Sequence, residues 1–111
     1  LSVYNMTVRE NQMEKSLSLA LSGAMNRYYE PNMYIVDKKP VSSYDVEKAV
    51  IEDINERLTA GGTAIATVYV CDMEKGIISA GIEEEFKLPT GVTKKISCKK
   101  TIVADQPMED N

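Results

Sequence analysis

Histidine and tryptophan are absent from this 111-residue chain, and phenylalanine occurs once. Without histidine the sequence lacks the commonest general base near neutral pH and the commonest zinc ligand, so most hydrolase triads and zinc sites are excluded. Cysteine occurs only at Cys71 and Cys98, and two thiols without histidine are too few to close a zinc site. We therefore expect a protein that is not an enzyme and that holds no metal and no cofactor.

The 13 basic residues are outnumbered by 17 acidic residues, which gives the chain a net charge of -4. This negative charge argues against binding to nucleic acid or to an anionic membrane. No apolar run approaches the roughly 20 residues that cross a bilayer, and no signal-peptide pattern is present. The chain opens at Leu1 rather than at methionine. We expect any attachment to a membrane to depend on a segment upstream of Leu1.

The composition that remains, 43% hydrophobic and 27% charged, is typical of one globular domain. Periodic apolar patterns continue to about Ala104, which predicts a single domain over residues 1–104. The last residues, 105–111, offer no apolar face and are predicted to form a flexible tail.

A long amphipathic helix is predicted from Met6 to Tyr29, where apolar residues recur at spacings of three, four and seven. Arg9 lies off this apolar stripe. Asn5 or Thr7 is a candidate N-cap, and Pro31 is expected to end the helix.

A second helix is predicted over Tyr44 to Ala60, with Ser42 or Ser43 as its N-cap and the glycines at 61 and 62 at its end. Gly23, inside the first helix, is compatible with two interpretations. It is either a tolerated glycine or a point of close approach by another backbone.

The remainder of the chain has the two-residue alternation of β-strands. Strands are predicted at Thr63 to Met73, Ile77 to Leu88 and Val92 to Ala104, joined by turns at 73–76 and 89–91. They form an antiparallel meander. In the second strand Glu84 alone interrupts the apolar face.

These elements predict an α+β fold in which the two helices pack on one side of a three- to four-stranded, largely antiparallel sheet. The fourth strand would be Met33 to Val36, paired beside the first strand. The first strand is apolar on both faces, one carrying small residues that a helix can approach and the other carrying Ile65, Tyr69 and Cys71. A strand of this kind is often central, and something must cover its second face.

We therefore expect an interaction surface around Tyr34, Ile65, Tyr69 and Cys71. A protein partner, including a second copy of the chain, is one candidate to cover it. An alternative is that the same apolar surface is a groove for a small ligand.

The cysteines are predicted on the first and third strands, so one strand lies between them and their Cα atoms are about 9–10 Å apart at least. A disulfide requires less than about 7 Å. The spacing favours two buried free thiols over a disulfide.

Charged residues on the sheet have ordinary structural explanations. Glu83 and Glu85 point to one face and Glu84 to the other, which favours a solvated sheet face over a site for a hard cation. Lys87, Lys95 and Lys99 are expected to form cross-strand ion pairs with Glu83 and Glu85.

The order of a long N-terminal helix, Met6 to Tyr29, a connector, a second helix and the three strands named above resembles the extracellular parts of pilin-like and tight-adherence pseudopilin-like proteins. In those families the N-terminal helix continues upstream into a membrane-spanning, filament-forming segment. The resemblance implies a non-enzymatic structural or assembly domain of a bacterial surface or secretion-type protein, outside the cell. The alternative is a small ligand-binding or accessory module of the cytosol.

Overall fold

The computed structural model describes residues 3–29, 42–58 and 64–104, with side chains from residue 6 onward. It confirms the α+β fold. The described elements are, in chain order, α1 (Val3–Tyr28), α2 (Ser43–Arg57), β1 (Ile65–Asp72), β2 (Ile77–Lys87) and β3 (Thr93–Val103). The sheet has the antiparallel order β1-β2-β3. The predicted strand at 33–36, with Tyr34, lies outside the described residues.

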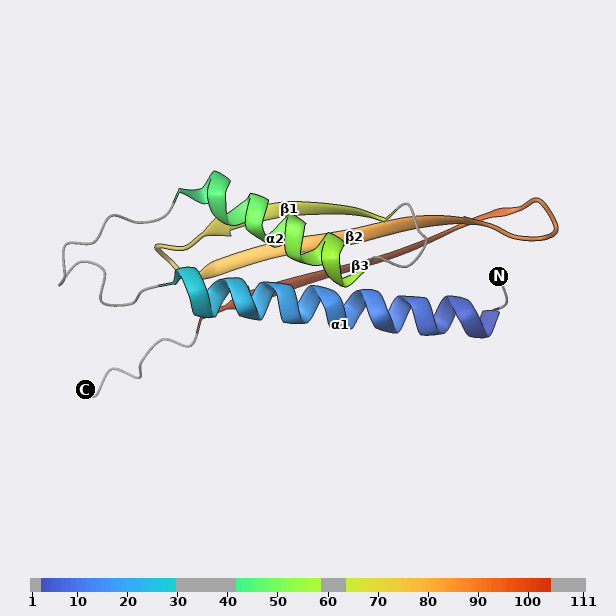
Figure 1. The fold of residues 1–111 in the computed structure, drawn as a ribbon, viewed down its shortest axis with the longest axis horizontal. Coiled ribbons are helices and arrows are strands. Elements are labelled where there is room, and N and C mark those ends of the chain that lie inside the picture. Colours follow the sequence, from blue (N-terminus) through green and yellow to red (C-terminus); the bar gives the residue numbers. More distant parts are fainter. Residues whose placement is uncertain (1–2, 30–41, 59–63, 105–111) are drawn as a thin grey trace.

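Both helices lie on one side of the sheet (Figure 1). α1 packs along β3 and β2, and α2 packs along β1 and against α1. With 26 residues α1 is about 39 Å long, and β2 with 11 residues is about 36 Å long. This similarity in length lets one helix follow most of the sheet, up to the end of the β2–β3 hairpin, which reaches beyond it (Figure 1).

The core lies between the helices and the sheet because each element presents one apolar row to it. Its most buried side chains are Met13, Leu17 and Leu21 of α1, Val46, Val50 and Ile54 of α2, and Ile78 and Ile82 of β2. The predicted apolar stripes of both helices and of the second strand therefore face the core as expected.

The start of α2 is as predicted, and the start of α1 is not. Ser42 is the N-cap of α2, where its Oγ accepts a hydrogen bond of 3.2 Å from the Asp45 backbone N–H. α1 already begins at Val3, so Asn5 and Thr7 lie inside the helix and the prediction that one of them caps it was wrong. Among the described residues, no proline or glycine precedes Asn5 and Thr7. Once the helix has formed, it therefore extends readily through these two residues.

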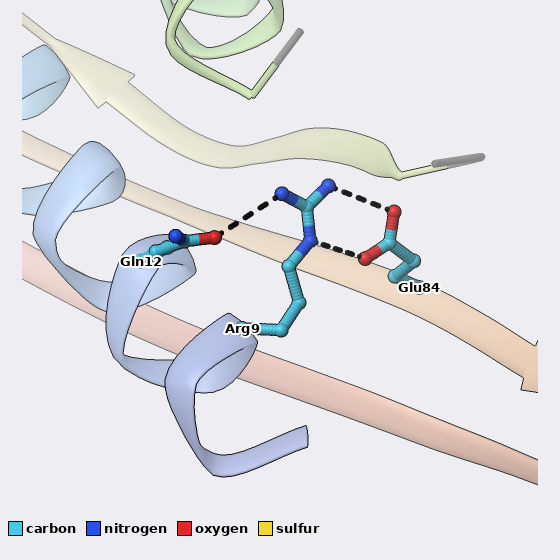
Figure 2. Close-up of polar contacts among 3 residues, drawn as sticks. All are labelled: Arg9, Gln12 and Glu84. Atoms are coloured by element: carbon cyan, nitrogen blue, oxygen red, sulfur yellow. Dashed lines mark hydrogen bonds and ion pairs between the residues drawn. The ribbon is translucent and has the colours of Figure 1, made fainter. Parts of the chain in front are cut away.

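Glu84, the exception in the apolar face of β2, is completely buried beneath α1 and pairs with Arg9 (Figure 2). Arg9 Nε donates to Glu84 Oε1 at 2.7 Å, and its second guanidinium nitrogen donates to Oε2 at 3.0 Å. Hydrogen bonding to Glu84 raises the pKa of Arg9 above its ordinary value. This bidentate contact holds α1 against β2 at one position along the hairpin.

Gly23 faces open space, because a Cβ built on it would meet no atom within 4 Å. The interpretation as a close backbone approach was wrong, and the glycine is simply tolerated.

Replacing Gly23 with alanine is therefore expected to raise the free energy of unfolding by about 0.5–1 kcal/mol, because alanine loses less backbone entropy in a helix. Urea denaturation followed by circular dichroism measures the change. Gly91, which has a φ of 89°, is the control, since alanine there must destabilise the protein. If Gly23→Ala lowered the free energy of unfolding, the result would contradict the observation that Gly23 faces open space.

Candidate functional site: the open face of the sheet

The side of the sheet that faces away from the helices is the candidate functional site. We call its three-stranded part the open face. It consists of Ile65, Thr67, Tyr69, Val70 and Asp72 of β1, Ile77, Ser79, Gly81 and Glu83 of β2, and Ser97, Lys99, Thr101 and Val103 of β3. Ile65 is 67% exposed and Val103 is 59% exposed, and Tyr69 and Val70 are exposed too. Exposed apolar side chains on one sheet face are typical of an interaction surface.

Tyr69 lies across the centre of the open face, over Gly81. A Cβ on Gly81 would lie 3.0 Å from Cε2 of the Tyr69 ring, a tight contact that the ring would have to relieve by moving a few tenths of an ångström. Lys99, the β3 partner of Gly81, places its Nζ 4.7 Å from the ring centroid. The ring is thus held between a glycine and a cation and needs little ordering before it contacts a partner.

A β-bulge in β1 decides which residues share the open face with Tyr69. The register shifts between Val68, which pairs with Ala80, and Val70, which pairs with Ser79. The extra residue reverses the alternation beyond it, so that Cys71 pairs with the buried Ile78 and packs against the core. The expectation that Cys71 lies on the same face as Ile65 and Tyr69 was wrong, and Val70 takes that place.

Both cysteines are free thiols, in agreement with the favoured prediction, and both are half-buried rather than buried. Burial raises the pKa of the Cys71 thiol, and the charges of Glu47 and Asp72 raise it further. Burial also raises the pKa of Cys98. Both thiols are therefore protonated near neutral pH and are poor nucleophiles.

The predicted cross-strand ion pairs form only around Lys95. Its ammonium pairs with Glu83 and, at 3.9 Å, with Glu85. Lys99 instead contacts the Tyr69 ring, and Lys87 makes no ion pair within the described chain. Glu84 lies on the opposite face from its neighbours, and residues 3–29, 42–58 and 64–104 contain no cluster of three metal-ligating side chains.

A hollow of about 390 Å³ lies on the open face. Ile65, Thr67 and Tyr69 line it from β1, and Ser97 and Lys99 line it from β3. Its walls offer one cation, one carboxylate, three hydroxyl groups and apolar surface. This combination suits a side chain or loop of a partner, or a small organic ligand.

Sequence reasoning placed Ile65 and Tyr69 on the second face of β1 and missed Val103 and the Tyr69–Gly81 contact. The glycine at 81, inside an otherwise good strand, was the available signal, because an isolated strand glycine indicates a bulge or a close approach. Glu84 was noticed as an exception, but its partner was not identified. A carboxylate in an apolar row requires a cation from another element, and Arg9 is the arginine of the facing helix near its start.

In the part of the chain that the structure describes, no helix is both long enough and apolar enough to cross a membrane. Comparisons of the chain with protein-family models, with curated proteins and with solved structures found no match.

Proposed function

We propose that this protein is a non-enzymatic structural or assembly domain of a pilin-like, bacterial surface or secretion-type protein, and that the open face is a protein–protein contact. The observation that carries the proposal is the exposed apolar row on the open face, with Tyr69 held in place over Gly81. A sheet that is covered by helices on one side and apolar on the other is suited to bury its second side against another chain. The resemblance in element order supports the same role.

The test is site-specific photo-cross-linking in cells that produce the protein. A photoreactive residue at position 69 is expected to give discrete cross-linked species, because this position would lie inside a contact. Tyr44 is the matched control, since it is an exposed tyrosine on α2, on the helix side of the molecule. Equal cross-linking from positions 69 and 44, or none from 69, would contradict the proposal.

The hollow on the open face favours a second candidate, a small-ligand module. A ligand that binds the folded state raises the unfolding midpoint, and the rise grows with the logarithm of its concentration once that concentration exceeds the Kd. A concentration-dependent rise with a metabolite, lost in a Tyr69→Ser variant, would favour that function over assembly.

A further inference from the structure

The β2–β3 hairpin extends beyond the rest of the sheet. β1 begins at Ile65, opposite Glu83, so from Glu84 to Ile96 only two strands are paired. Figure 1 shows the end of this hairpin reaching past the N-terminal end of α1. α1 covers the base of this arm, where Arg9 pairs with Glu84. A two-stranded ribbon beyond such support is marginally stable in water, so contact with another surface would stabilise its tip.

The tip of the arm, residues 87–94, combines a turn that contains Leu88 and Val92 with two exposed lysines. The turn is tight, because Leu88 N donates to the Val92 carbonyl and Gly91 N donates to the Leu88 carbonyl, both at 2.8 Å. Val92 is 53% exposed. Lys87 and Lys94 are exposed, and no described carboxylate lies within ion-pair distance of either ammonium.

A groove of about 420 Å³ lies between α1 and α2, and its charge is opposite in sign to that of the tip. Its floor is made of small residues, Ala20 and Gly23 of α1 and Ala49 of α2. Three carboxylates and two guanidinium groups line it, which leaves one net negative charge. Glu52 and Glu56 are exposed at its side and have no described cation within ion-pair distance, whereas Asp53 is paired with Arg57.

We propose that the tip of one copy of this chain docks into the α1–α2 groove of a second copy. The apolar turn would cover the small-residue floor, and Lys87 and Lys94 would approach Glu52 and Glu56. Charge complementarity selects this occupant, because two lysines of the tip and two glutamates of the groove have no counter-ion among the described residues, and the groove lining has a net charge of -1.

A chain cannot fill its own groove in this way. Met6 lies beside Lys94 to Ser97 of the arm, and 17 residues of helix, about 25 Å, separate Met6 from Gly23 in the groove. The contact is therefore heterologous, joining two different surfaces of two copies. The inference rests on the proposed assembly role but uses none of the open-face residues.

Sedimentation velocity over a range of protein and salt concentrations tests the contact. The unaltered protein is expected to self-associate, more weakly at high salt. The tip variant Lys87→Glu/Lys94→Glu and the groove variant Glu52→Lys/Glu56→Lys are each expected to weaken association by about tenfold or more, because like charges meet. An equimolar mixture of the two variants is expected to recover association, since the intact tip of one variant meets the intact groove of the other, and the reversed tip and the reversed groove are again opposite in charge.

A second pair of variants tests the groove without changing charge. Gly23→Leu fills the groove from a position that has open space around it, and it is expected to abolish association while the helix stays intact. Ser22→Leu adds the same side chain at the neighbouring exposed position, outside the groove lining, and is expected to leave association unchanged. Equal effects of the two substitutions would overturn the proposal.

Other outcomes of these experiments also test the docking of the tip into the groove. A protein that stays monomeric at every concentration, or that associates equally well in the tip and groove variants, overturns the docking of tip into groove. Loss of association in Tyr69→Ser but not in the tip and groove variants overturns it too, while supporting the open face as a contact. If cross-linking at position 69 fails while the tip and groove variants behave as expected, the docking of tip into groove is supported and the open face as a contact is overturned.

Discussion

Substituting methionine for Arg9 is expected to lower the free energy of unfolding by about 3–5 kcal/mol, the usual effect of removing one partner of a buried ion pair. The Glu84 side chain has no exposure to solvent, and both of its oxygens accept hydrogen bonds from Arg9. Methionine keeps the helix propensity and much of the length of arginine but leaves the carboxylate without a cation. Because small domains are stable by only about 5–15 kcal/mol, this loss is a large part of the total.

Chemical denaturation followed by circular dichroism measures this effect, with two comparisons. Lys95→Met breaks the exposed pair with Glu83 and is expected to change stability far less, because an ion pair exposed to solvent contributes little. The double variant Arg9→Met/Glu84→Met removes both charges and is expected to recover most of the stability, because a buried ion pair replaced by packed apolar side chains is often neutral or stabilising. If Arg9→Met cost no more than Lys95→Met, the buried pair would not hold α1 against the hairpin.

Replacing Gly76 with alanine is expected to lower the free energy of unfolding by about 2–5 kcal/mol. Gly76 has a φ of 74°, a conformation that costs other residues about 1–2 kcal/mol. A Cβ there would lie 2.7 Å from Cβ of Ala104 and 2.9 Å from Cε1 of the Tyr29 ring, and such overpacking adds about 1–3 kcal/mol.

Gly91→Ala separates these two causes. Gly91 has a similar φ of 89°, but a Cβ there would meet nothing within 4 Å. Alanine at 91 is therefore expected to cost only the conformational part, about 1–2 kcal/mol. The same denaturation measurement compares the two variants, and equal losses would show that the Tyr29 and Ala104 contacts do not restrict Gly76.

The open face has two properties that alternation alone could not predict. A strict two-residue period assigns Cys71 to the same side as Tyr69, but the bulge at Val68 to Val70 sends Cys71 toward the core and exposes Val70. A bulge depends on pairing with a second strand, so it has no simple signature in β1 itself. The contact of Tyr69 with Gly81 likewise joins two strands whose register is fixed only when they pair.

Local sequence patterns were enough to predict the type and order of the described helices and strands, the core-facing sides of both helices and of β2, and a serine N-cap at position 42 or 43. These are local properties, because apolar spacing and capping chemistry act over a few residues. Packing of the helices on the sheet was needed to establish that Glu84 pairs with Arg9, which face Cys71 occupies, and where the hairpin tip and the α1–α2 groove lie. Each of these depends on residues that are distant in the chain and become neighbours only when the helices pack on the sheet.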